Sequence, residues 1–307
     1  MADSDMATFR DRLIATGMLL PTGVDGVWGR SGTFERILAG LDHAIGVAGA
    51  DGGMAAEVMR FPPAMARQTF ERSGYMKNFP QLAGTIHCFC GDERAHRKLL
   101  GEIDKGEEWM AGQVPADLVL TPASCYPVYP IVAARGPLAS EGHLVDVASY
   151  CFRHEPSLEP TRFQLFRIRE YVRLGTADQV VAFRQSWIDR AQALFRALEL
   201  PFTLDIANDP FFGRGGKLMA DNQRTQALKF ELLVPVNDGQ PPTACGSFNY
   251  HMTHFAETWG MHDAAGEPAH TACVGFGMER LTLALLRHHG FDPAAWPAGV
   301  TATLGLA

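Results

Sequence analysis

Apolar and polar residues alternate along two stretches of the chain that flank a short polar segment. The first stretch starts near residue 147 and ends in Arg153-His154-Glu155, and the second covers about 162–174. The segment between them, 156–161, contains two prolines. Because a period of two is typical of strands and proline is typical of turns, we predict an antiparallel hairpin over 147–175.

Side chains at alternate positions share one face of a strand. On that basis, Arg153 and Glu155 share a face of the first predicted strand, and Arg162, Phe166 and Glu170 share a face of the second. This face would combine two guanidiniums, two carboxylates and an aromatic ring, a set that is costly to bury without a ligand. The hairpin is therefore the first candidate for a binding site.

Helical periodicity predicts two helices that cover a core. Apolar residues recur at helical spacing over 33–47, and the small residues of 46–53 then predict a break. A second apolar stripe runs through 177–198, and Thr176 is a suitable N-cap for it.

Charged residues dominate 92–112, which we predict to be helical. A solvated helix is the simpler interpretation, and a docking surface for a partner is the alternative. Shorter apolar runs predict further strands, and a glycine-rich loop is expected over 209–217. The predicted strands cover 84–90, 118–123, 202–207 and 227–236.

Composition and charge narrow the possible functions. The chain has 307 residues, of which 47% are apolar and 20% charged, as expected for a globular protein of one large or two modest domains. The net charge is −7 and the chain has no basic run, which argues against an extended nucleic-acid partner. No apolar run reaches the about 18 residues of a membrane span, and the N-terminus has no signal core. We expect a cytoplasmic protein that does not contact a membrane.

Six cysteines are present, and none forms a CxxC pair. In a reducing compartment they are free thiols or metal ligands. We expect Cys88 and Cys90 to be half-buried core residues. Cys125 stands at the end of the strand predicted over 118–123, where functional residues often lie.

Polar residues gather in 243–259, where we expect Ser247 and Asn249 to belong to a substrate pocket. A zinc site formed by His251 and His254 is a weaker alternative. Further on, Gly275-Phe276-Gly277 precedes an amphipathic helix with Arg280 in its first turn. Glycines allow close approach of the backbone to a ligand.

Taken together and in this order, these features resemble motifs 2 and 3 of class II aminoacyl-tRNA synthetases, at 147–175 and 272–290. The resemblance is strongest to the catalytic core of seryl-tRNA synthetase, since 118–155 is similar to the run into its motif 2 and 227–234 to its KYDxE strand. It covers about residues 70–295. The implied fold is α+β, with a class II synthetase-like antiparallel sheet flanked by helices.

The run FRIREYVRLGT resembles the methanogen-type seryl enzymes, which hold a catalytic zinc between Cys, Glu and Cys. The matching positions here are Cys125, Glu170 and Cys273. Their spacing alone does not indicate a zinc site. The resemblance implies one Zn²⁺ per chain, with the substrate's α-amino group as its fourth ligand.

Bacterial amino acid:[carrier protein] ligases are similar to truncated enzymes of this type. We expect a single catalytic domain over 1–307, with a helical lead-in over 1–70, a core over 71–307 and no tRNA-binding domain. The short turn at 156–161 also weakens a tRNA assignment. The resemblance implies a homodimer that activates a small amino acid with ATP and transfers it to the phosphopantetheine thiol of a carrier protein. A tRNA-charging enzyme and a non-catalytic paralogue are the alternatives.

The resemblance also assigns roles to residues. Arg153 would hold the α-phosphate of ATP, and Arg162 and Arg280 the outer phosphates. Arg153 and Arg280 would be the catalytic pair. Phe166 would stack on adenine with Arg280 on the opposite face, Glu155 would accept a hydrogen bond from the adenine amino group, and Glu231 would help to hold Mg²⁺.

The resemblance to the family, together with the residues expected around the side chain, indicates which amino acid is used. We expect Ser247, Asn249, Phe248 and Met252 to enclose it, which favours glycine or alanine without deciding between them. No glutamate near 245–247 matches the second Mg²⁺ ligand of the seryl enzymes. The cognate carrier protein and its docking surface stay open, with 92–112 and 177–198 as candidates.

Overall fold

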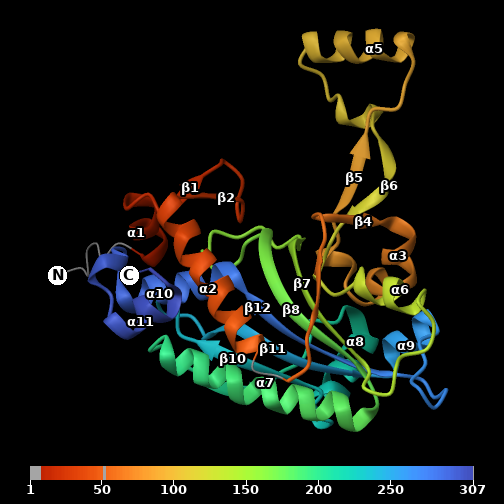
Figure 1. Ribbon diagram of the computed structural model, residues 1–307. Helices are drawn as coiled ribbons and strands as arrows, with labels where there is room; N and C mark the ends of the chain where they lie inside the picture. Colours follow the sequence, from red (N-terminus) through yellow and green to blue (C-terminus); the bar gives the residue numbers. More distant parts are fainter. Residues whose placement is uncertain (1–7, 51–52, 307) are drawn as a thin grey trace.

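The structure is a computed structural model, and it describes residues 8–50 and 53–306. Its centre is a seven-stranded sheet with the strand order β3-β7-β8-β12-β11-β10-β9 (Figure 1). Neighbouring strands are antiparallel except β3 and β7, which are parallel. The strands are β3 (Glu57–Arg60), β7 (His143–Phe152), β8 (Leu165–Gly175), β9 (Thr203–Ile206), β10 (Lys229–Val234), β11 (Thr243–Met252) and β12 (His270–Gly277). The predicted α+β class is confirmed.

One face of the sheet is covered by long helices. They are α2 (Gly32–Ala50), α7 (Ala177–Ala197) and α10 (Met278–His289), joined by the shorter α1 (Phe9–Ala15) and α11 (Ala298–Leu304) (Figure 1). Phe248, Val274 and Phe276 point into this core from the sheet. Since side chains alternate, their neighbours Asn249, Cys273 and Gly275 are left for the opposite face.

The opposite face is only partly covered. Helices α6 (Val128–Ala133) and α9 (His254–Trp259) pack there against a second cluster, which includes Val147 and Val172. This partial cover leaves room for a cavity over strands β8, β10, β11 and β12.

Helix α7 confirms the prediction over 177–198 almost to the residue. The side-chain hydroxyl of Thr176 accepts from the backbone N–H of Gln179, and the Gln179 side chain accepts from the N–H of Thr176 in return. Such a capping box satisfies two amide groups that a helix start leaves without partners. Trp187 and Ile188, from the predicted apolar stripe, are buried.

The break predicted over 46–53 is wrong for the residues described, because α2 continues to Ala50. Gly49 lies against Tyr171 of β8, and a Cβ atom there would overlap the tyrosine hydroxyl. A Cβ atom on Gly46 would be 3.2 Å from a guanidinium nitrogen of Arg169, which is a tight contact and not an overlap. The small residues therefore serve a close helix-to-sheet contact instead of ending the helix. Residues 51–52 lie outside the described part.

A three-stranded sheet of order β4-β6-β5 carries an arm that stands away from the body (Figure 1). Its strands are β4 (Ala64–Ala66), β5 (Thr85–Cys88) and β6 (Val114–Leu120), and helices α3 (Arg67–Arg72) and α4 (Tyr75–Asn78) lie beside its base. The charged helix α5 (Glu93–Asp104) is at the tip and has no buried residue. Cys88 and Cys90 are exposed on this arm, so their predicted half-burial is wrong.

The connection between β7 and β8 is longer than the predicted turn. It runs over residues 153–164, so Arg153, Glu155 and Arg162 lie in the loop and not on strands. The backbone N–H of Arg153 still donates to the carbonyl of Gln164 at 2.9 Å, which aligns the loop with the hairpin.

A helix, α8 (Gly213–Thr225), replaces much of the glycine-rich loop predicted over 209–217. Two strands near the N-terminus, β1 (Leu19–Pro21) and β2 (Trp28–Arg30), form a hairpin, and 3₁₀ turns occupy Pro80–Leu82, Met110–Gly112 and Pro293–Ala295. Among the described residues, none of the helices has the length and apolar character that crossing a membrane requires.

Candidate active site

A cavity of about 500 Å³ lies over the open face of the large sheet. It collects nearly all side chains that the sequence marked as functional. These are Cys125, Arg153, Glu155, Phe166, Glu170, Glu231, Ser247, Asn249, Cys273 and Arg280.

The strand register brings the residues of the cavity into one row. Glu231 of β10 pairs with Ser247 of β11, Ser247 with Gly275 of β12, and Gly275 with Glu170 of β8. A Cβ atom on Gly275 would be 3.4 Å from Cγ of Glu170 and 3.5 Å from Oγ of Ser247. The glycine therefore keeps the centre of the row open between these side chains.

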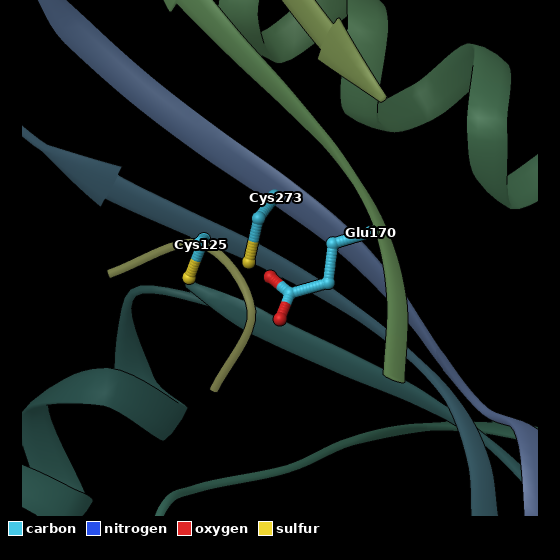
Figure 2. A group of neighbouring side chains, drawn as sticks. All are labelled: Cys125, Glu170 and Cys273. Atoms are coloured by element: carbon cyan, nitrogen blue, oxygen red, sulfur yellow. The ribbon is translucent and has the colours of Figure 1, made fainter. Parts of the chain in front are cut away.

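Three potential metal ligands converge at one end of the cavity. Cys125 comes from the loop after β6, Glu170 from β8 and Cys273 from β12, and Figure 2 shows their side chains pointing toward one another. One ligand atom from each lies within 4.8 Å of the other two, and all three residues are buried. A backbone N–H, that of Ser124, donates to Oε1 of Glu170 at 2.9 Å and fixes the carboxylate.

The donor set fits a zinc ion. Two thiolates and a carboxylate are ligands that Zn²⁺ accepts, and three protein ligands leave a fourth position open. The neighbouring thiol of Cys273, followed by burial, raises the pKa of Cys125 well above its usual value. Burial also raises the pKa of Glu170. Both shifts make deprotonation of these ligands harder than in water, and a bound cation would oppose them because metal binding displaces protons.

Polar side chains of β11 surround Cys273. The amide Nδ2 of Asn249 donates to Sγ of Cys273 and to Oγ of Ser247, each at 3.4 Å. Nε2 of His251 lies 3.6 Å from the same sulfur. Burial lowers the pKa of His251 to about 3, so its ring is neutral near pH 7. His251 and His254 both line the cavity, but neither belongs to the group of converging ligands among the described residues.

Two guanidiniums in the cavity make hydrogen bonds to backbone carbonyls and no ion pair within the described part of the chain. Arg280 donates from Nε to the carbonyl of Thr161 at 3.0 Å and from a terminal nitrogen to that of Ala244 at 3.1 Å. Arg153 donates to the carbonyl of Pro122 at 3.3 Å, and its guanidinium carbon lies 5.4 Å from the centre of the Phe166 ring. Within the described residues, neither has a carboxylate at ion-pair distance. An anionic ligand would compensate both charges.

Arg162 differs from the other two arginines. It is exposed and is not among the residues that line the cavity. It pairs with Glu159 at 2.8 Å and with Glu155 at 3.3 Å. The structure therefore does not bring Arg162 together with Arg153 and Arg280.

The predicted enclosure of the amino acid by Phe248 and Met252 is wrong. Phe248 is fully buried in the core beneath α7, and the Met252 residue is 42% exposed. Neither lines the cavity. Ser247, Asn249 and His251 occupy the open face because they alternate with Phe248 along β11.

Sequence reasoning also missed a lysine in the cavity. Lys229 of β10 is nearly buried and forms ion pairs with Asp209 at 2.5 Å and Glu231 at 3.1 Å. Gln223 of α8 donates to Asp209 at 2.8 Å. Lys229 and Glu231 are two residues apart on one strand, so alternation puts them on the same face. Their partner Asp209 lies in the segment that was predicted to be a glycine-rich loop, and no local pattern connects it to Lys229.

Comparison with known proteins assigns the family. No family model matches the chain. The sequence is 50% identical to an amino acid–[acyl-carrier-protein] ligase 2 of Bradyrhizobium diazoefficiens over 294 residues, which are 96% of this chain and 87% of that protein. It is 51% identical to ligase 1 of the same organism over 284 residues, or 92% and 86%. The chain belongs to the amino acid–[acyl-carrier-protein] ligase family.

More distant similarity connects the chain to seryl-tRNA synthetases. A type-2 serine–tRNA ligase of Methanococcus aeolicus is 30% identical over 198 residues, which are 61% of this chain and 37% of that enzyme. The family resemblance expected from motifs 2 and 3 is thereby confirmed.

Solved structures confirm the class II aminoacyl-tRNA synthetase fold. Seryl-tRNA synthetase of M. kandleri, solved with a tRNASec of A. aeolicus, has a TM-score of 0.82 and 20% identity, and the match covers 97% of this chain and 60% of that one. Seryl-tRNA synthetase of Pyrococcus horikoshii, solved with ATP, has a TM-score of 0.70 and 14% identity over 99% and 64%.

Proposed function

We propose that the protein activates a small amino acid with ATP and transfers it to the phosphopantetheine thiol of a carrier protein. The names of the relatives at about 50% identity support the carrier protein as acceptor. The observation that carries the proposal is the meeting of two unpaired guanidiniums with a Cys–Glu–Cys group in one cavity. The two guanidiniums suit a polyphosphate, and the Cys–Glu–Cys group suits a metal ion that would bind an amine.

The first step joins the amino acid to the α-phosphate. A carboxylate oxygen forms the new bond to phosphorus, and the bond from phosphorus to the pyrophosphate oxygen breaks. Negative charge builds on the phosphoryl oxygens, and cations fixed in advance lower this barrier. Arg153 would contact the α-phosphate and Arg280 the outer phosphates. Each guanidinium is already held by backbone carbonyls, so little reorganisation is needed.

The remaining nucleotide contacts come from the same cavity. The ring of Phe166 would stack on adenine, with Arg280 on the far face and Glu155 accepting from the adenine amino group. Glu231 would contribute an oxygen ligand to Mg²⁺ between the phosphates. Arg162, which is exposed and paired, would reach a phosphate only after leaving Glu155 and Glu159.

Cys125, Glu170 and Cys273 would hold zinc. When bound, zinc would offer an open coordination position to the neutral α-amino group of the substrate. Ser247 and Asn249 would face the substrate side chain. The space beside Cys273 is already occupied by Asn249 and His251, which supports a small substrate such as glycine or alanine.

The second step is attack by the carrier's thiol sulfur on the carbonyl carbon of the aminoacyl-adenylate. A carbon–sulfur bond forms, the bond from carbon to the phosphate oxygen breaks, and AMP leaves. The thiol proton is released to solvent in this step. The product is a thioester on the phosphopantetheine arm.

An amino-acid panel in ATP–pyrophosphate exchange, followed by transfer to carrier protein, tests this function. We expect exchange with glycine or alanine and a thioester on the phosphopantetheinylated carrier but not on the apo carrier. The apo carrier is the matched control, because it differs only in the missing thiol. Charging of tRNA with no labelling of any carrier would contradict the proposal and favour a synthetase.

The arm that carries α5 is our proposed docking surface for the carrier. Arg94, Arg97 and Lys98 are exposed there, beside Leu100 and Ile103, which are 45% and 50% exposed. Arg97 and Lys98 pair with Glu93 and Glu102 at 3.6 and 3.4 Å, and such exposed ion pairs are weak enough for a partner to replace. On the alternative, α7, Arg184 donates to the carbonyls of 227 and 228 and packs over Phe230. A partner with an acidic helix would complement α5.

Reversing the charge of Arg94, Arg97 and Lys98 to glutamate should lower the rate of transfer to the carrier at least about tenfold at low salt. ATP–pyrophosphate exchange should be unchanged, since α5 lies at the tip of the arm, away from the large sheet (Figure 1), and none of its residues lines the cavity. Arg196→Glu is the matched control, because Arg196 is an exposed cation on α7. If that control blocks transfer and the α5 variant does not, docking on α5 is wrong.

A further inference from the structure

His251 connects two buried polar groups next to the metal ligands. Its Nε2 lies 3.6 Å from Sγ of Cys273, and its Nδ1 lies 3.1 Å from Oγ1 of Thr271. The ring packs edge-on against Phe255, with centroids 4.9 Å apart, and lies similarly edge-on to Tyr129 at 6.4 Å. Packing and two polar contacts therefore fix the orientation of the ring.

The contacts of the ring select one tautomer. A neutral imidazole carries one N–H donor and one acceptor nitrogen. Sulfur in a metal-bound thiolate is an acceptor only, so the nitrogen that faces it must carry the hydrogen. Nδ1 is then the acceptor, and the hydroxyl of Thr271, which is fully buried, donates to it. The resulting chain runs from the Thr271 hydroxyl through His251 to Cys273.

We infer that His251 is a positioning residue for the metal centre, which donates its Nε2–H to the sulfur of Cys273 and is itself oriented by Thr271. The inference rests on the zinc site proposed above and extends it beyond its three ligands. Asn249 donates to the same sulfur at 3.4 Å, so Cys273 receives two N–H groups. Such outer contacts orient a ligand and adjust its donor strength.

A role for His251 as a fourth ligand is the competing interpretation. It would close the coordination shell and turn an open site into a structural one. The geometry does not favour it, because among the described residues only Cys125, Glu170 and Cys273 have ligand atoms that all lie within 4.8 Å of one another. The ring nitrogen Nε2 instead contacts one sulfur, that of Cys273, at 3.6 Å.

Zinc competition with a chelator and the optical spectrum of the Co²⁺-substituted protein test the inference. His251→Phe keeps an aromatic ring but removes both nitrogens. We expect zinc affinity to fall about 10- to 100-fold. The thiolate-to-cobalt charge-transfer band should move to longer wavelength, because a thiolate that loses an N–H donor gives up an electron more easily.

Two further variants test the N–H donor and the orientation of the ring separately. His251→Gln returns an N–H donor and should bring both readouts back toward wild type. Thr271→Val removes only the hydroxyl that orients the ring and should move the band in the same direction as His251→Phe, by less. His254→Phe is the matched control, since His254 also lines the cavity but has no contact with a metal ligand among the described residues, and it should leave both readouts unchanged.

The outcomes separate this inference from the proposed function. If His251→Phe binds zinc as tightly as wild type and leaves the cobalt band in place, the positioning role is refuted while the zinc site stands. Complete loss of metal in both His251→Phe and His251→Gln, with folded protein by circular dichroism, would make the ring a ligand and also overturn it. A wild-type protein that binds neither zinc nor cobalt would remove the zinc site and this inference with it.

Discussion

Replacing Arg280 with alanine should reduce ATP–pyrophosphate exchange by at least about 100-fold, the usual cost of removing one fixed electrostatic contact to a transition state. Arg280 lies in the first turn of α10 and projects into the cavity. Burial lowers the pKa of Arg280. Arginine is effectively always protonated in proteins, so the guanidinium carries its charge while it lacks a carboxylate partner among the described residues. A cation in that state is available to a phosphate.

The variant loses hydrogen bonds to the carbonyls of Thr161 and Ala244, so its fold must be checked by circular dichroism and thermal unfolding. Arg280→Lys is the second variant, because it keeps the charge and loses the planar fork, and we expect an intermediate rate. Arg287→Ala is the matched control on the same helix, where Arg287 pairs with Asp238 away from the cavity. Normal exchange by a folded Arg280→Ala protein would overturn the role given to Arg280.

The sequence predicted those parts of the site that depend on strand alternation. Phe166 and Glu170 were expected on one face of a strand, and both line the cavity from β8. Alternation needs only the identity of a strand and its period, both of which are local properties. The position of Arg280 in the first turn of α10 was also predicted from a local pattern, namely the glycines that precede an amphipathic helix.

Local sequence patterns did not predict the parts of the structure that depend on contacts between distant segments. Gly46 and Gly49 looked like a helix break, but they admit Arg169 and Tyr171 of β8 against α2. Arg162 was expected to share a face with Phe166, but the connection between the strands extends to residue 164 and leaves it in the loop with Glu155 and Glu159. Neither segment contains a local sequence pattern that identifies the residues it contacts elsewhere in the fold.

The three candidate metal ligands illustrate a third case. Cys125, Glu170 and Cys273 are too far apart in the chain for spacing to suggest a site, and they were selected by resemblance to a zinc enzyme. Their convergence depends on the pairing of β8 with β12 and on the loop that places Cys125 above them. Only the folded sheet establishes that pairing.

Zinc removal is the second large effect that we expect. Metal analysis of the purified wild-type protein should find one zinc per chain, and Cys273→Ala should contain close to none. Removing one of three ligands leaves a thiolate and a carboxylate, and the proton then competes well for both because burial raises the pKa of Glu170 and contributes to that of Cys125. Amino acid activation should be lost with the metal.

Cys245→Ala is the matched control for this prediction. Cys245 is also a buried thiol of the sheet, but it is not one of the three converging ligands. It should retain zinc, so a common loss in both variants would indicate general unfolding. Wild-type protein without zinc, or Cys273→Ala with an unchanged zinc content, would refute the site, since a buried cluster of two thiols and a carboxyl would then be a neutral, hydrogen-bonded part of the core.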